Sequence, residues 1–275
     1  MSIQRISIMG CGWLGFALAG RLTDKGHFVR GSTTTKDKIP LLEQAGIEPY
    51  YIVLNPTPEG DDLNSFFDVD TVIINIPPPR VSDRPAFMKQ QARELVSHIN
   101  ASRTQRVVMV SSTGIYPSRD QEAFESDDHE PETENGHGLL AMESTLQNEL
   151  QARVAVIRMA GLFGPERKPG RFLAGRNVSG NGEEPVNMIH LEDATGVLAA
   201  LVEQKELTGV FNACASEHPS RKQFFQTAAK LSGLEPPVFE GSDPRPWKKI
   251  NSRKIRQEVG YLFVFDDPLQ GLLHC

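Results

Sequence analysis

Residues 3–15 decide the fold: the apolar run Ile3-Gln-Arg-Ile-Ser-Ile-Met9 leads directly into Gly10-Cys-Gly12-Trp-Leu-Gly15. The first segment is predicted to be a strand, and the residues that follow have the apolar spacing of a helix ending before Gly26. In Gly-x-Gly-x-x-Gly at a strand–helix turn, the first glycine permits the tight turn and the second lets the backbone approach phosphates. The third lets the helix pack on the strand. Because a helix N-terminus also offers free N–H groups, the pattern predicts a pyrophosphate site.

The same stretch has a competing interpretation as a secretory signal. Arg5 precedes an apolar run, and Ala17-Leu-Ala19 imitates a cleavage site. We favour the nucleotide site, because three glycines at turn spacing would serve no purpose in a cleaved peptide. Leu14, Leu18 and Leu22 also share one helix face, as expected for a helix packed on a sheet.

Strand and helix patterns alternate after this unit. Further strands are predicted at 28–30, 51–54, 71–76, 106–111 and 154–159, and helices at 38–44, 83–98 (capped by Asp83 or Ser82) and 138–150. Such alternation indicates a parallel sheet covered on both faces. We therefore expect an α/β protein with a Rossmann-type doubly wound parallel sheet over residues 1–165, to which the strand–helix–strand pattern of 186–213 returns. Residues 166–275 are expected to form a smaller mixed C-terminal region on the substrate side, with a capping box at Ser220 and Gln223.

Composition excludes several classes of function. The net charge of −6 leaves no global basic footprint for nucleic acid. Three distant cysteines, an odd number, argue for a reducing compartment and against a disulfide framework. No apolar run approaches the roughly 18 residues that span a membrane. We expect a cytoplasmic protein whose partner is a small-molecule substrate or ligand, with neither nucleic acid nor membrane.

No metal site is predicted. Residues 120–134 carry eight carboxylates, but they lack histidine spacing and an EF-hand pattern. This acidic run is interpreted as a solvated loop.

Several further segments carry a family resemblance. They are Ser111-Ser-Thr-Gly-Ile-Tyr116, Gly161-Leu-Phe-Gly-Pro165, Asn187-Met-Ile-His-Leu-Glu-Asp193, Asn251-Ser-Arg-Lys-Ile255, Pro169-Gly-Arg-Phe172 and His218-Pro219. Together with the glycine turn, they resemble the extended short-chain dehydrogenases/reductases, the NAD(P)-dependent epimerase/dehydratase superfamily. More narrowly they resemble its atypical YeeZ-like branch. The resemblance covers nearly the whole chain and implies a nicotinamide dinucleotide cofactor and a polar or nucleotide-sugar substrate. Outer helices commonly pair in this superfamily, so a homodimer is one possible state, and the oligomeric state stays open.

The chemistry that the resemblance implies uses a Ser or Thr after the fifth strand, a Tyr, and a Lys four residues after the Tyr. Ser112 matches the first, with Thr113 adjacent, but no Tyr-x-x-x-Lys exists in the chain. Asn135 and Leu139 stand where the Tyr and Lys belong. A positioned proton donor contributes roughly 10²–10⁴-fold to rate, so its absence matters.

Two residues are candidate substitutes for the missing proton donor. His137 lies in the segment of the missing pair, and Tyr116 follows Ser112 and Thr113. His190 is interpreted as a hydrogen-bonded structural residue. The catalytic candidates are therefore Ser112, Thr113, Tyr116 and His137.

The stretch after the second strand, Arg30-Gly-Ser-Thr-Thr-Thr-Lys36, predicts the cofactor. NAD sites place an acid here for the ribose 2′-hydroxyl, but no acid precedes Asp37. Hydroxyls and cations suit a 2′-phosphate, so we expect NADP rather than NAD. The expected contacts are Gly10, Cys11, Gly12, Trp13, Leu14, Gly15, Arg30, Ser32, Thr33, Lys36, Asn75 and Pro77.

Two functions stay open at this point. One is an NADP-dependent oxidoreductase or epimerase/dehydratase-like enzyme with a degenerate Tyr-x-x-x-Lys site, and the nearly complete scaffold favours it slightly. The other is a catalytically inactive NADP(H)-binding sensor or regulatory protein, which the missing Tyr and Lys support.

Overall fold

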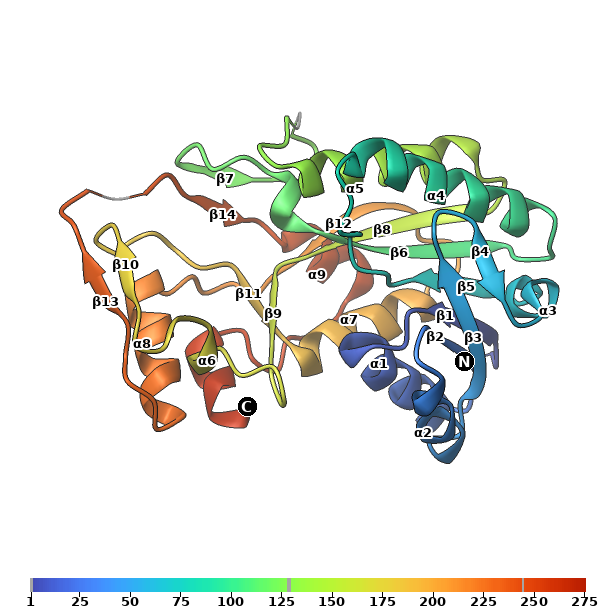
Figure 1. Cartoon of the computed structure of the whole chain (residues 1–275), viewed down its shortest axis with the longest axis horizontal. Coiled ribbons are helices and arrows are strands. Elements are labelled where there is room, and N and C mark those ends of the chain that lie inside the picture. Colours follow the sequence, from blue (N-terminus) through green and yellow to red (C-terminus); the bar gives the residue numbers. More distant parts are fainter. Residues whose placement is uncertain (1, 128–129, 244) are drawn as a thin grey trace. The chain divides into compact units, whose positions relative to one another are not determined.

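The computed structural model describes residues 2–127, 130–243 and 245–275 (Figure 1). A sheet of eight strands runs in the order β12-β8-β6-β5-β1-β2-β3-β4. Its strands are β1 (Arg5–Met9), β2 (Phe28–Thr33), β3 (Glu48–Leu54), β4 (Pro58–Gly60), β5 (Thr71–Ile74), β6 (Arg106–Ser112), β8 (Arg153–Met159) and β12 (Gly209–Ala213). From β6 through β3 the neighbouring strands are parallel, and only β4 joins β3 antiparallel among the pairings described. The predicted Rossmann-type α/β class is confirmed.

The chain forms two compact units. The first comprises Met1–Ile115, Glu130–Arg158 and Thr195–Phe211, and the second comprises Tyr116–His129, Met159–Ala194 and Asn212–Cys275. Helices of the first unit are α1 (Trp13–Asp24), α2 (Ile39–Gln44), α3 (Leu63–Phe67), α4 (Arg84–Asn100), α5 (Glu134–Glu149) and most of α7 (Leu191–Glu203). Figure 1 shows α4 and α5 above the sheet and α1 and α7 below it, so both faces are covered.

The second unit is built from short elements. Parallel pairs join β7 (Gln121–Ala123) to β14 (Lys248–Ile250), β9 (Gly161–Phe163) to β11 (Met188–His190), and β10 (Asn177–Ser179) to β13 (Val238–Glu240). Its helices are α6 (Gly170–Leu173), α8 (Arg221–Leu231), α9 (Arg253–Val259) and α10 (Pro268–Gly271). One core cluster of this unit comprises Phe163, Val186, Met188, Phe224, Ala228 and Leu272, of which Phe163 and Phe224 are fully buried.

Local signals in the sequence explain several helix starts. The Asp83 side chain accepts from the amide of Ala86 at 3.1 Å, so Asp83 rather than Ser82 caps α4. The Ser220 side chain accepts from the amide of Gln223 at 3.2 Å and caps α8 as predicted. Leu14, Leu18 and Leu22 form the buried face of α1. These capping and periodicity rules act over a few residues, which is why sequence alone predicts them.

Helix α5 begins four residues before its predicted start at 138, because Thr133 caps it through a bond from the Gly136 amide of 3.0 Å. Gly136 and Gly138 have low helix propensity and hide this first turn in the sequence. Both glycines are required for steric reasons. A Cβ at Gly136 would lie 2.7 Å from Pro131, and one at Gly138 would lie 2.6 Å from the sulfur of Met88.

Within the described part of the chain, no helix is both long and apolar enough to cross a bilayer.

Candidate functional site

The glycine turn after β1 is tied to two neighbouring strands. The amide of Gly10 donates to Ser32 Oγ at 2.9 Å, and the amide of Cys11 donates to the Ser32 carbonyl at 2.8 Å. From the end of β5, Asn75 Nδ2 donates to the carbonyl of Gly10 at 2.9 Å. The turn is therefore held by the carboxyl ends of β2 and β5, the edge where ligands of open α/β sheets bind.

The three glycines have different roles. Gly10 has φ +100°, and a Cβ there would lie 2.3 Å from the carbonyl oxygen of Asn75. A Cβ at Gly15 would lie 2.2 Å from the carbonyl oxygen of Gly10, so this glycine lets α1 approach β1. A Cβ at Gly12 would meet nothing within 4 Å. Gly12 therefore leaves space open at the N-terminus of α1.

A cavity of about 400 Å³ opens over this turn. Seven of the predicted contacts line it, namely Gly10, Cys11, Gly12, Ser32, Thr33, Asn75 and Pro77. The other lining residues are Met9, Thr34, Thr35, Lys38, Ile52, Leu54, Ile76, Pro78, Pro79 and Gln91. The cavity lies wholly within the first unit.

Five predicted contacts are not among the lining residues: Trp13, Leu14, Gly15, Arg30 and Lys36. Leu14 is buried on the inner face of α1. Arg30 Nε lies 3.0 Å from Glu48 Oε2, and its Nη1 donates to the carbonyl of Ser65. The ammonium of Lys36 lies 5.1 Å from the ring centroid of Tyr51.

Lys38 is the cation that lines the cavity instead. The one-turn helix Lys36–Lys38 carries it there after the extended residues 28–33. The sequence pattern predicted Arg30 or Lys36 as the phosphate contact, whereas Lys38 lies two residues beyond Lys36 in the same turn. The Thr33 hydroxyl, which accepts from the amide of Thr35 at 3.1 Å, begins this turn and was the available signal for it.

Cys11 packs rather than reacts. Burial raises the pKa of its thiol to about 12, so the thiol stays protonated near neutral pH. A Cβ at Gly31 would lie 2.6 Å from the Cys11 sulfur, which explains the glycine in the middle of β2.

The catalytic candidates have different surroundings. Ser112 is half-buried, and its Oγ accepts from the amide of Gly114 at 3.0 Å. Thr113 is buried next to it, whereas His137 is exposed on the first turn of α5. Tyr116 is buried in the second unit, and its hydroxyl donates to Asn212 Oδ1 at 2.7 Å. The Tyr116 proton is thus already engaged in a buried hydrogen bond.

The two positions of the missing Tyr and Lys lie on α5. Asn135 is exposed, and Leu139 is 6% exposed and packs in the core. Neither side chain ionises. Further along α5, Glu143 is buried and pairs with Arg158 at 2.7 Å while accepting a bond from Ser111 Oγ. The polar residues shared by α5, β6 and β8 therefore form a buried structural network.

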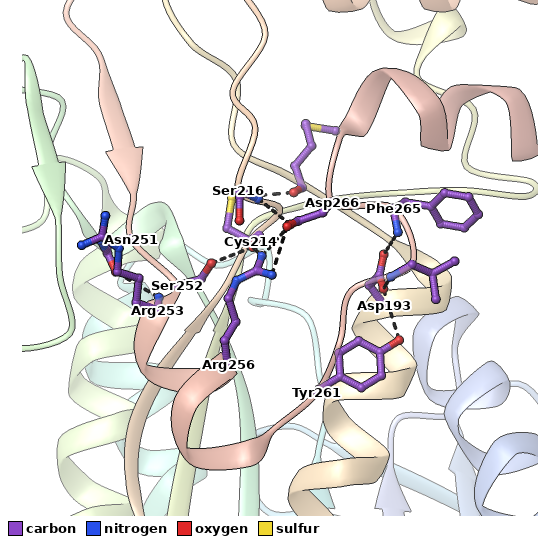
Figure 2. A network of polar contacts seen from close by, with 12 residues as sticks. Asp193, Cys214, Ser216, Asn251, Ser252, Arg253, Arg256, Tyr261, Phe265 and Asp266 are labelled. Atoms are coloured by element: carbon purple, nitrogen blue, oxygen red, sulfur yellow. Dashed lines mark hydrogen bonds and ion pairs between the residues drawn. The ribbon is translucent and has the colours of Figure 1, made fainter.

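A second structural network surrounds Asp193 (Figure 2). Its buried carboxylate accepts from the amides of Val264 and Phe265 at 2.6 and 2.9 Å and from the Tyr261 hydroxyl at 3.1 Å. Burial raises the pKa of Asp193 despite these bonds, because it disfavours the charged form. Burial also lowers the pKa of His190, whose Nδ1 accepts from the amide of Glu192 at 3.2 Å.

Among the described residues, no group of three or more His, Cys, Asp or Glu side chains could hold a metal ion. Asp128, in the acidic run of 120–134, lies outside the described residues.

A full-length relative places the chain in a family, although no family model matches the chain. Protein YeeZ of Escherichia coli (strain K12) is 36% identical over 270 residues, which cover 97% of this chain and 98% of that protein.

Solved structures share the fold. The UDP-glucuronic acid 4-epimerase from Bacillus cereus in complex with NAD has a TM-score of 0.81 at 16% identity, covering 98% of this chain and 94% of that one. MoeE5 in complex with UDP-glucose and NAD has a TM-score of 0.78 at 17% identity, with coverage of 98% and 96%. A functionally unknown conserved protein from Silicibacter pomeroyi DSS has a TM-score of 0.77 at 22% identity, with the same coverage. The 36% identity to Protein YeeZ over nearly the whole length of both chains shows that this chain belongs to the YeeZ family, and the solved structures show that it shares the fold of the UDP-glucuronic acid 4-epimerase.

Proposed function

We propose that this chain binds NADP(H) in the cavity at the glycine turn and acts as an oxidoreductase or epimerase/dehydratase-like enzyme on a small polar metabolite or nucleotide sugar. The observation that carries the proposal is the open space at Gly12 within a cavity of about 400 Å³. Backbone amides at the start of α1 and the lack of a Cβ suit a pyrophosphate. The neighbours bound to NAD share the fold and add support.

The lining of the cavity supports NADP over NAD. Ser32, Thr33, Thr34 and Thr35 supply hydroxyls, and Lys38 supplies a cation. The described lining residues include no carboxylate that would bond a ribose 2′-hydroxyl and repel a 2′-phosphate. We assign the 2′-phosphate contact to Lys38 in place of Arg30, because Glu48 already compensates the charge of Arg30.

The residues near Ser112 support only slow catalysis. A bound nicotinamide ring accepts or donates a hydride. Ser112 can orient a substrate oxygen, but its hydroxyl is too weak an acid to deliver a proton near neutral pH. Tyr116 is left out of the proposed proton transfer, because its hydroxyl is buried against Asn212. His137 is exposed and remains as the candidate proton donor.

These features predict slow or absent turnover of ordinary epimerase and dehydratase substrates. The alternative function is an inactive NADP(H)-binding sensor or regulator. Asn135 and Leu139 favour it, because neither side chain can ionise at the positions where the Tyr and Lys belong. Tight NADPH binding without turnover across a broad panel of metabolites would favour the sensor.

Fluorescence titration with NADPH and NADH tests the proposal. Wild type should bind NADPH more tightly than NADH. Lys38→Gln should lower the ratio of the NADPH and NADH affinities by roughly tenfold, because it removes one charge-assisted contact. Lys89→Gln removes an exposed cation from α4, outside the lining, and serves as the matched control. Equal or tighter binding of NADH by wild type would overturn the NADP assignment.

A further inference from the structure

Gln91 is a polar residue on the buried face of α4. Its side chain is 4% exposed, and the other buried residues of this helix are Met88, Ala92, Leu95, Val96 and Ile99. Gln91 also lines the cavity of about 400 Å³ over the glycine turn. Because burial removes the Gln91 amide from bulk water, its polar atoms need partners from the protein or from a ligand.

Only one side of the Gln91 amide has such a partner in the described part of the chain. Nε2 donates to the carbonyl of Leu54, the last residue of β3, at 3.1 Å. Oε1 is buried and has no hydrogen-bond partner among the residues that the structure describes. Since a backbone carbonyl only accepts, the contact with Leu54 requires the NH₂ side of the amide and fixes Oε1 on the other side. An unpaired buried acceptor is unfavourable, so this position suits a ligand that brings a donor.

The place of Gln91 along the sheet selects the part of a dinucleotide that can supply this donor. From β1 the sheet continues to β2 and then to β3. A Rossmann-type site holds the pyrophosphate at the turn after β1 and the adenosine ribose at the residues after β2. The base then extends toward the end of β3, where Leu54 holds the Gln91 amide. The nicotinamide half extends in the opposite direction, across the point where the strand order reverses between β1 and β5.

The walls at this end of the cavity suit a flat aromatic base. Ile52 and Leu54 line the cavity from β3, and residues 76–79, an isoleucine followed by three prolines, line it from the segment after β5. Apolar walls of this kind hold a planar ring but do not distinguish one base from another. Selection between bases therefore depends on a polar group at the edge of the ring, which is the usual division of roles in a ligand pocket.

We propose that Gln91 selects the adenine base of the cofactor, with Oε1 accepting a hydrogen bond from the exocyclic amino group. The inference rests on the proposed dinucleotide binding and adds the residue that recognises the base. Adenine presents an N–H donor at this edge, whereas hypoxanthine presents a carbonyl oxygen in the same place. That oxygen would face Oε1, and neither atom carries a hydrogen. Turning the Gln91 amide over would offer hypoxanthine a donor only at the expense of the bond to Leu54.

Fluorescence titration of the full chain with NADPH and with its hypoxanthine analogue, in which a carbonyl replaces the adenine amino group, tests the inference. Wild type should bind NADPH roughly tenfold more tightly than the analogue, because the analogue loses one hydrogen bond and leaves Oε1 unpaired. Gln91→Met keeps an unbranched side chain without an amide and should bring the ratio of the two affinities close to one. Gln90→Met is the same change at the exposed neighbouring residue of α4, outside the lining, and should keep the wild-type ratio.

The wild-type ratio decides the inference even if Gln91→Met does not fold. Equal binding of the two nucleotides by wild type, or an unchanged preference in a folded Gln91→Met variant, would overturn the inference and leave the proposed function standing. If wild type prefers NADH to NADPH, the NADP assignment fails, and the same ratio between NADH and its hypoxanthine analogue decides the role of Gln91. Absence of binding by all four dinucleotides would overturn the proposed function and this inference together.

Discussion

The side-chain amide of Asn75 donates a hydrogen bond to the carbonyl oxygen of Gly10, with 2.9 Å between Nδ2 and O. The backbone of the same asparagine passes so close that a Cβ at residue 10 would lie 2.3 Å from its carbonyl oxygen. One residue at the end of β5 thus holds the glycine turn by its side chain and restricts it by its backbone.

Asn75→Ala is expected to loosen this turn. The free energy of unfolding of the variant should be lower than that of wild type by about 1 kcal/mol, the typical contribution of one hydrogen bond. Its affinity for NADPH should fall roughly fivefold. Chemical denaturation and fluorescence titration measure the two effects. Asn148→Ala, which removes an exposed amide bonded to Ser144 on α5, is the control and should change neither. Unchanged NADPH affinity in Asn75→Ala would show that the turn keeps its geometry without this bond.

The motif glycines should separate into structural and ligand-facing residues. Gly15→Ala is expected to lower the free energy of unfolding by more than about 2 kcal/mol, because its Cβ would meet the Gly10 carbonyl at 2.2 Å. Gly12→Val should unfold like wild type but lose NADPH binding, since its side chain would occupy the open space of the cavity. Gly20→Ala, also with no atom within 4 Å of its Cβ, is the control for α1. A Gly12→Val variant that titrates with NADPH like wild type would refute the site.

The buried ion pair of Glu143 and Arg158 should contribute strongly to folding. Both side chains are under 5% exposed, so removing one partner leaves a buried charge uncompensated. Arg158→Met is expected to cost about 3–5 kcal/mol of unfolding free energy. Arg103→Ala breaks an exposed pair with Asp68 and should cost less than about 1 kcal/mol. Urea denaturation of both variants checks the contrast, and similar losses in the two would contradict the role of burial.

Ser112 and Tyr116 should differ in their effects on any turnover. Ser112→Ala is expected to reduce residual activity by at least tenfold without a change in stability. Tyr116→Phe should retain activity but lose about 1–3 kcal/mol of stability, because Asn212 Oδ1 would remain buried without its donor. Parallel assays of turnover and melting temperature distinguish the two. Loss of turnover in a stable Tyr116→Phe variant would return Tyr116 to the catalytic group.

Stability should fall as the solution becomes acidic. Burial lowers the pKa of His27 and His190 below the ordinary value of 6.5, so both stay neutral in the folded state while the unfolded chain takes up protons. Each histidine therefore contributes stability above about pH 6.5 that is lost as pH falls below it, by at most about 1.4 kcal/mol per pH unit. Denaturation at pH 7.5 and 5.5 should show the loss. His27→Gln should show a smaller difference between the two conditions, and an identical difference would contradict the assignment to His27.

The sequence was sufficient to predict the fold class, and seven of the predicted cofactor contacts line one cavity. The turn at Gly10–Gly15 obeys local rules of backbone freedom and close packing, and the helix face of α1 follows a 3.6-residue period. Ser32, Asn75 and Pro77 could be predicted because parallel strands β1, β2 and β5 end at one edge of the sheet. These features depend on spacing along the chain and on a topology common to the family.

Tertiary structure alone decided which charges are available. Arg30 follows the expected strand, but the register of β2 and β3 places it opposite Glu48, and the resulting ion pair occupies its guanidinium. Lys38 lines the cavity instead. Tyr116 meets Asn212 across 96 residues of sequence, and Arg256 meets Asp266 and Cys214 only after the second unit folds. A residue's type and spacing predict the chemistry that it could perform, whereas its partners depend on strand register and long-range packing, which no local pattern encodes.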